Sequence, residues 1–123
     1  LKGRRVVLVD DSIVRGTTLR SLRRMVREAG ASEIHVRISS PPVRNPCYYG
    51  MDFPTESELL ASNMSVEDMR KYLGVESLGY LSIEGMVSSA RELEGQFCTG
   101  CFSGCYPDEE LNKPARSQTA LPL

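Results

Sequence analysis

The chain has 123 residues, of which 41% are hydrophobic and 25% charged, and this composition is typical of one soluble globular domain. The net charge of −1 favours neither a nucleic-acid partner nor a membrane surface. No apolar run approaches the roughly 20 residues that a membrane-spanning helix needs, and no signal peptide is visible. We therefore expect a cytoplasmic protein.

The N-terminal part of the sequence predicts a strand followed by a helix. Residues 5–9 are apolar and β-branched without alternation, which predicts a strand buried on both faces. From residue 19 to residue 29, apolar side chains recur at helical spacing. We expect a hydroxyl side chain, that of Thr17 or Thr18, to cap this helix, and Gly30 to follow its end.

A second strand is predicted at residues 33–39, which makes a strand, helix, strand unit with parallel strands. We divide the chain into a βαβ core at 1–40, a helical and cysteine-containing remainder of the same domain at 41–111, and a disordered tail at 112–123. Within the remainder we expect the following elements: a non-helical segment at 41–50, helices at 56–61, 65–74 and 82–93, a strand at 78–81 and a glycine-rich loop, FCTGCFSGCYP.

The stretch VVLVDDSIVRGTT joins the first strand to the helix. Asp10 and Asp11 follow the strand at its carboxyl end, where open parallel sheets bind ligands. Residues 12–18 then lead to a helix N-terminus, whose free N–H groups and positive dipole end favour phosphate. Gly16 permits a close approach of the backbone, and three hydroxyl side chains add donors.

Two carboxylates beside a phosphate site would repel the phosphate unless another group lies between them. The vicinal hydroxyls of a sugar can donate to both acids, and Mg²⁺ takes oxygen ligands from one or two carboxylates. The stretch therefore suggests a ribose 5-phosphate, with or without Mg²⁺. The alternative is a solvated turn that caps the helix.

VVLVDDSIVRGTT resembles the phosphoribosyl-diphosphate motif of the type I phosphoribosyltransferases. Its SIVRGTT part, together with SSPPVRNPCYYGMDFP, ESLGYLSIEGM and FCTGCFSGCYP, is similar to the glutamine-dependent amidotransferase branch of that family. The resemblance covers about residues 3–110. It implies an α/β fold, namely part of a type I phosphoribosyltransferase domain with a parallel, Rossmann-like sheet, C-terminal helices and a cysteine-rich tail.

The resemblance also implies an activity. Ammonia from glutamine displaces pyrophosphate from phosphoribosyl diphosphate, and the phosphoribosylamine that forms is the first committed product of purine synthesis. Asp10 and Asp11 would bind the ribose hydroxyls and contribute to a Mg²⁺ site. Members are usually homotetramers inhibited by purine nucleotides. The 5-phosphate would be held by Ser12, Ile13, Val14, Arg15, Gly16, Thr17 and Thr18.

The chain departs from the family pattern at its start. No cysteine precedes Cys47, and the glutaminase domain, the earlier strands, the pyrophosphate loop and the flexible lid are absent. We therefore expect the C-terminal part of the enzyme, inactive by itself. The alternatives are another type I phosphoribosyltransferase and a non-catalytic module that senses phosphoribosyl diphosphate or binds a cluster.

Three of the four cysteines form the spacing C-x2-C-x3-C in FCTGCFSGC. Without a signal peptide, this spacing favours a metal or cluster over two disulfides. By resemblance, Cys47, Cys98 and Cys101 would be three of the four ligands of a [4Fe–4S] cluster, with the fourth ligand upstream. A zinc site or free buried thiols are the alternatives, and Cys105 has no ligand position to match.

Four arginines, Arg20, Arg23, Arg24 and Arg27, lie on the first predicted helix opposite its apolar residues. We expect them to form a solvated face. His35 lies within the second predicted strand, and we expect it to be structural rather than catalytic.

Overall fold

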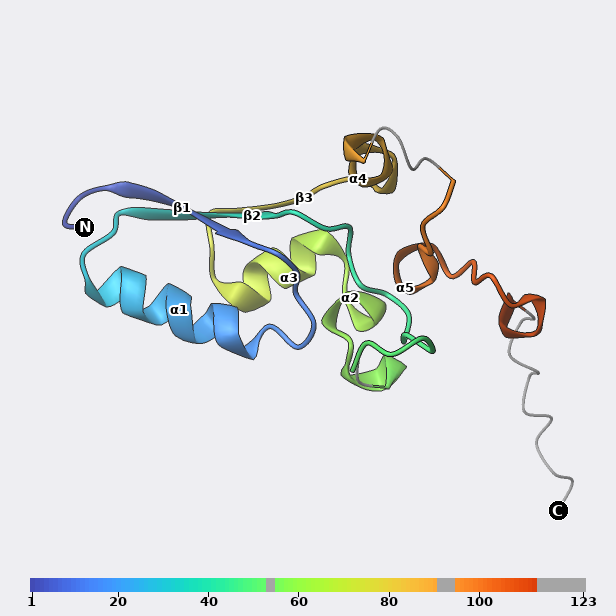
Figure 1. The fold of residues 1–123 in the computed structure, drawn as a ribbon. Helices are drawn as coiled ribbons and strands as arrows, with labels where there is room; N and C mark the ends of the chain where they lie inside the picture. Colours follow the sequence, from blue (N-terminus) through green and yellow to red (C-terminus); the bar gives the residue numbers. More distant parts are fainter. Residues whose placement is uncertain (53–54, 91–94, 113–123) are drawn as a thin grey trace, which may run out of the picture.

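The structure, a computed structural model, describes residues 1–52, 55–90 and 95–112 (Figure 1). Its centre is a parallel three-stranded sheet in the order β1-β2-β3. The strands are β1 (Arg5–Asp10), β2 (Glu33–Ile38) and β3 (Ser77–Tyr80). The helices are α1 (Thr17–Glu28), α2 (Leu60–Asn63), α3 (Val66–Leu73), α4 (Ile83–Ser89) and α5 (Gly100–Ser103), with 3-10 turns η1 (Glu56–Glu58) and η3 (Glu109–Asn112). The predicted strand, helix, strand unit and its parallel pairing are confirmed.

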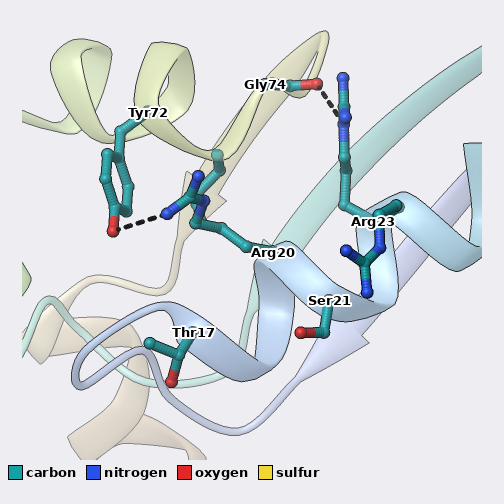
Figure 2. A pocket seen from close by; sticks show the side chains of 8 residues that line it. Thr17, Arg20, Ser21, Arg23, Tyr72 and Gly74 are labelled. Carbon is teal, nitrogen blue, oxygen red and sulfur yellow. Dashed lines mark hydrogen bonds between the residues drawn. The ribbon is translucent and has the colours of Figure 1, made fainter.

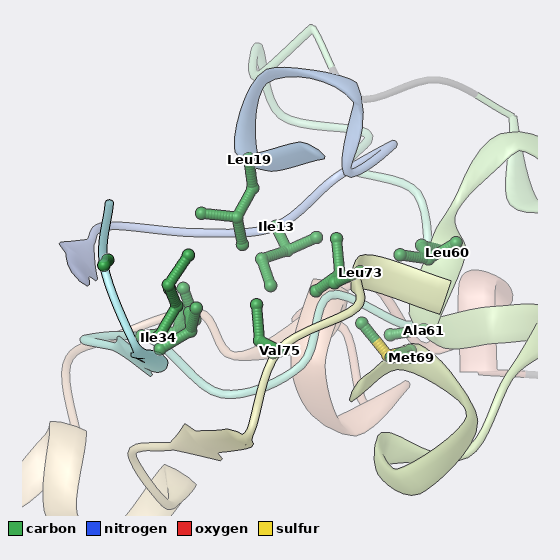
Figure 3. Packing of buried hydrophobic residues seen from close by; sticks show 11 residues of the cluster. Ile13, Leu19, Ile34, Leu60, Ala61, Met69, Leu73 and Val75 are labelled. Atoms are coloured by element: carbon green, nitrogen blue, oxygen red, sulfur yellow. The ribbon is translucent and has the colours of Figure 1, made fainter. Parts of the chain in front are cut away.

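The core lies between the sheet and the helices α1 and α3, which cover the same face (Figures 1 and 3). Alternate residues of β2, namely Ile34, Val36 and Ile38, point into this layer and are at most 3% exposed. Burial of each such large side chain contributes about 1.5–3 kcal/mol. The rest of the cluster is Ile13, Leu19, Ala31, Leu60, Ala61, Met69, Leu73 and Val75.

Strand β1 is not buried on both faces, so that prediction is wrong. Its exposure alternates, and Val7 and Val9 are 58% and 74% exposed. The reason is that α1 and α3 both lie on the opposite face of the sheet (Figure 1). Apolar character along a strand shows that it prefers burial, but the covering layers come from elsewhere in a protein.

Glycines with positive φ lie at the start of α1 and at the ends of α3 and α5. α1 begins after Gly16 (φ +78°) and has no side-chain cap, so the predicted threonine cap is wrong. Gly30 (φ +94°) follows α1 as predicted. α3 has the predicted cap, since the Ser65 hydroxyl accepts the Asp68 N–H at 3.1 Å, and it ends at Gly74 (φ +68°).

The predicted helix at 56–61 is divided between η1 and α2, and the one at 82–93 is described as α4. Ser82 caps α4 by accepting the Gly85 N–H at 2.9 Å. Residues 91–94 of that predicted helix lie outside the described residues, as does the predicted tail from residue 113 onward. None of the helices in the described part is long and apolar enough to cross a membrane.

The glycine-rich segment FCTGCFSGCYP was expected to be a loop, but it contains the short helix α5. The N–H groups of Phe102 and Ser103 donate to the Thr99 carbonyl oxygen at 2.9 and 2.8 Å and close one turn. The ring of Tyr106 packs where a Gly100 side chain would be, 2.3 Å from the position of a Cβ. The absence of a side chain at Gly100 thus allows the Tyr106 ring to pack against α5.

Candidate functional site

The residues from Asp10 to Leu19 line a cavity of about 320 Å³ at the carboxyl end of β1. This volume is within the range of small-molecule sites. Asp10 ends β1 opposite Ile38 of β2, and its carbonyl oxygen accepts the Ser39 N–H at 3.0 Å. The structure therefore brings every predicted sugar-phosphate residue, from Asp10 to Thr18, to one cavity.

The residues that line the cavity have backbone N–H donors that no protein group in the described ranges uses. Among the described residues, the N–H groups from Ser12 to Leu19 donate to no protein acceptor, and the first helical bond of α1 runs from the Arg20 N–H to the Gly16 carbonyl oxygen at 3.0 Å. Because α1 has no side-chain cap, its first N–H groups stay open to a ligand. Together with the positive end of the helix dipole, they form a place for an anion.

Each aspartate has one carboxylate oxygen engaged locally. Oδ1 of Asp10 accepts the Asp11 N–H at 2.9 Å, and Oδ1 of Asp11 accepts the Ser12 hydroxyl at 2.9 Å. The second oxygen of each carboxylate accepts no hydrogen bond from the described residues. Two such oxygens fit Mg²⁺, which is usually bound by one or two carboxylates with other oxygens from water and substrate phosphates.

The loop is held in place by contacts that sequence reasoning missed. The side chain of Ile13 is 2% exposed in the core, so only its backbone can face a ligand. The Leu60 N–H donates to the Val14 carbonyl oxygen at 2.9 Å. A Cβ on Gly16 would lie 3.0 Å from Leu60 Cδ2, so a larger residue would require the Leu60 side chain to shift, in addition to the strain of the positive φ.

Arg15 is paired rather than free. Its Nη2 lies 3.3 Å from Oε1 of Glu58, with the two side chains 55% and 49% exposed. The Thr55 hydroxyl and, next, the Arg15 guanidinium lower the pKa of Glu58. The residues that hold the loop, Glu58 and Leu60, had one signal in the sequence, the apolar run LLA at 59–61. That run predicts burial but does not show that it packs against the loop.

The structure brings the two cysteine segments together. The N–H groups of Arg44 and Asn45 both donate to the Cys101 carbonyl oxygen at 3.0 Å, which ties the approach to Cys47 to α5. Burial first, and then the nearby Cys47 and Cys98 thiols, raise the pKa of Cys101. All four cysteines are free thiols, and Cys105 is exposed.

Tyr106 joins the same two segments and was not singled out by sequence reasoning. Its hydroxyl donates to the Pro46 carbonyl oxygen at 2.7 Å, and its ring meets that of Tyr48 edge to face with centroids 5.0 Å apart. Burial, followed by the neighbouring Tyr48, raises the pKa of Tyr106 to about 12. Tyr106 therefore acts as a structural contact between the residues around Cys47 and α5.

The fold and the site define a class of protein. A parallel sheet with helices on it, and an aspartate pair that leads through an amide-lined loop into a helix, constitute part of the type I phosphoribosyltransferase fold, as predicted.

Comparison with known proteins narrows this class, although no family model matches the chain. The chain is similar to the amidophosphoribosyltransferase of Methanothermobacter thermautotrophicus (55% identity over 107 residues, 87% of this chain). It is also similar to those of Synechococcus elongatus (52% over 121 residues, 98% of this chain) and Mycobacterium tuberculosis (51% over 126 residues, 98% of this chain). The chain spans 23% of the length of the first relative and 24% of the other two.

Two solved structures are also similar to this chain. One is the glutamine phosphoribosylpyrophosphate amidotransferase from B. subtilis in complex with ADP and GMP, with a TM-score of 0.78 at 50% identity. The match covers 86% of this chain and 24% of that one. The other, an allosteric regulatory enzyme of purine biosynthesis, has a TM-score of 0.79 at 49% identity, with coverage of 87% and 24%.

Proposed function

We propose that this chain is the C-terminal part of the phosphoribosyltransferase domain of an iron–sulfur-bearing amidophosphoribosyltransferase. The whole protein would convert phosphoribosyl diphosphate and glutamine into 5-phosphoribosylamine, the first committed step of purine synthesis. One observation is central to the proposal: open N–H groups line a cavity beside Asp10 and Asp11, in a chain about half identical to enzymes of that name.

In this proposal the loop binds the sugar phosphate in two parts. The N–H groups of residues 12–18 and the hydroxyls of Ser12, Thr17 and Thr18 donate to the 5-phosphate. The open carboxylate oxygens of Asp10 and Asp11 accept hydrogen bonds from the ribose hydroxyls and contribute to the Mg²⁺ site. Mg²⁺, when bound, would neutralise charge on the departing pyrophosphate.

The two aspartates also suit the reaction itself. The bond from the anomeric carbon to pyrophosphate breaks, and a bond to the ammonia nitrogen forms while pyrophosphate departs with the bonding electrons. Positive charge develops on the sugar ring in between, and fixed carboxylates beside the ring stabilise it. The loop contributes by placement, since its anchors to Leu60 and to the core hold the donors in one arrangement.

The same proposal includes a [4Fe–4S] cluster on Cys47, Cys98 and Cys101, with a fourth ligand from another segment of the protein. The pairing of Arg44 and Asn45 with Cys101 supports it by bringing the two cysteine segments together. In the described part of the chain, no three His, Cys, Asp or Glu side chains are grouped so that they could hold one metal ion. Thiolates bind both zinc and iron–sulfur clusters, so the iron and zinc content of the intact protein decides between the two.

Purine nucleotides are proposed as regulators, since the B. subtilis relative was solved with ADP and GMP, and a homotetramer is the proposed assembly. Another type I phosphoribosyltransferase and a non-catalytic sensing module are less well supported. The identity to the amidotransferases extends over nearly the whole chain, including both cysteine segments, and is not confined to the loop.

The double substitution Asp10→Asn, Asp11→Asn tests the assignment of the loop. It keeps the size of both side chains, so folding should persist, while Mg²⁺-dependent binding of phosphoribosyl diphosphate should weaken about tenfold or more for each charge-assisted hydrogen bond that the substitution removes. Calorimetry on the intact protein measures the affinity. Glu28→Gln, at the far end of α1, is the control. Wild-type affinity in the double variant would exclude this site.

A further inference from the structure

A second cavity lies between α1 and α3, outside the aspartate loop (Figure 2). Its volume is about 410 Å³. It is lined by Thr17, Arg20, Ser21, Arg23, Arg24, Tyr72, Leu73 and Gly74. We call it the arginine groove, because three lining side chains are guanidinium groups and none is acidic.

Two of the arginines are held in position by neutral partners. The Arg20 guanidinium carbon lies 4.7 Å from the ring centroid of Tyr72, and its Nη1 donates to the Tyr72 hydroxyl at 3.2 Å. Arg23 donates from Nε to the Gly74 carbonyl oxygen at 3.0 Å. Figure 2 shows both side chains reaching from α1 toward α3. Because these contacts already order both side chains, part of the conformational entropy is lost before a ligand binds. Each guanidinium group also keeps N–H donors that no protein group in the described part of the chain uses.

The positive charge of the groove is not compensated within the described residues. The arginines that form ion pairs there are Arg15, Arg27 and Arg70, none of which lines the groove. The expectation of a solvated arginine face on α1 is therefore too simple, since Arg27 pairs with Glu76 and Arg23 bonds to Gly74.

Helix geometry adds hydroxyl donors to the same surface. Thr17, Arg20, Ser21 and Arg24 are spaced i, i+3, i+4 and i+7, which places them on one face of α1. Neither the Thr17 nor the Ser21 hydroxyl has a hydrogen-bond partner in the described part of the chain. Guanidinium and hydroxyl groups on one face match the oxygens of phosphate, which guanidinium forks bind in bidentate fashion.

We propose that the arginine groove binds a small phosphorylated anion, as a site separate from the aspartate loop. Thr17 lines both cavities, so the two sites adjoin at the start of α1. The ligand is a diphosphate or a phosphate ester rather than a nucleic acid. The positive side chains are confined to one cavity of small-molecule size, and the chain as a whole carries a net charge of −1.

Calorimetric titration of the intact protein with pyrophosphate, at constant ionic strength and without Mg²⁺, tests this proposal. We expect Arg20→Gln, Arg24→Gln to weaken binding at the groove at least about tenfold. Arg24→Gln alone, which removes no hydrogen bond within the described residues, should weaken it severalfold and serves if the double variant folds poorly. Lys71→Gln is the control, because it removes a nearby positive charge that does not line the groove.

The outcomes separate this proposal from that of the aspartate loop. In the arginine variants, Mg²⁺-dependent binding of phosphoribosyl diphosphate should remain within about twofold of wild type, since their changes leave the loop intact. Equal affinity for pyrophosphate and ADP would show that the groove recognises the phosphate groups alone. Tighter binding of ADP would show that the groove also contacts the nucleoside, and either result supports the groove. Unchanged pyrophosphate binding in both arginine variants, or equal loss in Lys71→Gln, would overturn it.

Discussion

The Leu60 N–H donates to the Val14 carbonyl oxygen at 2.9 Å, so the first residue of α2 holds the middle of the loop that precedes α1. The same leucine packs in the core and lies against Gly16. A loop that carries open N–H donors would otherwise be mobile, and its ordering would oppose ligand binding. Leu60 thus links the stability of the core to the geometry of the proposed phosphate site.

Gly16→Ala should destabilise the protein more than Gly3→Ala does. Both glycines have positive φ, +78° and +70°, and alanine in that region costs about 1–2 kcal/mol. Only at Gly16 would the new Cβ also meet Leu60 Cδ2 at 3.0 Å, whereas nothing lies within 4 Å at Gly3. Urea unfolding measures the difference, and binding of phosphoribosyl diphosphate should fall only in the Gly16 variant. Equal losses of stability would show that Leu60 yields freely.

Ser65→Ala and Ser82→Ala remove equivalent helix caps with different expected consequences. Ser65 caps α3, whose Met69 and Leu73 are 0% and 2% exposed, so its loss should lower the free energy of unfolding by about 1 kcal/mol. Ser82 caps α4, which buries no residue, so its loss should mainly speed amide exchange within α4. An equal fall in global stability for both variants would contradict this distinction.

Glu76 should stabilise the protein in a pH-dependent way. The Ile34 N–H, and then Arg27 at 2.7 Å, lower the pKa of Glu76 from its ordinary value of 4.5. Because the folded-state pKa is the lower one, the contribution is complete above about pH 4.5 and is lost as the pH falls through the folded-state pKa.

Glu76→Gln should therefore cost about 1 kcal/mol at neutral pH, after allowance for solvent screening of this partly exposed carboxylate. It should also flatten the acid limb of the stability profile, measured by urea unfolding between about pH 3 and pH 7. Glu28→Gln, with no hydrogen-bond partner among the described residues, should leave both the stability and the profile nearly unchanged. A parallel shift of the whole profile in Glu76→Gln would contradict the assigned pKa direction.

Cys98→Ser and Cys105→Ser should distinguish a cysteine that binds the proposed cluster from one that does not. Anaerobically purified intact protein should be brown and contain roughly four irons per chain. Cys98→Ser should abolish both properties and loosen the two segments that meet at Cys101 and Tyr106. Cys105→Ser should retain the iron. Stoichiometric zinc without iron, or full iron content in Cys98→Ser, would refute the cluster.

Much of the candidate site could be predicted because its signals are local. The order of strand, diacid, glycine and helix places Asp10 and Asp11 at a sheet edge whatever the rest of the fold is, and the cavity contains every residue from Asp10 to Thr18. The helix cap could not be predicted in this way. Threonine and glycine are about equally good caps in isolation, and Gly16 occupies that position with a φ of +78°, where a Cβ would crowd Leu60 Cδ2 at 3.0 Å.

By itself, then, the sequence determined most of the elements, the parallel pairing of the first two strands and the diacid loop, because helical and strand periodicity and turn chemistry act over a few neighbouring residues. Only the tertiary structure decided which partners lie across the core. It placed Leu60 against the loop, left Val9 uncovered on one face of the sheet and set Arg20 over the ring of Tyr72. These pairs are far apart in the chain, and contacts of that kind depend on how whole faces pack together, which no local pattern encodes.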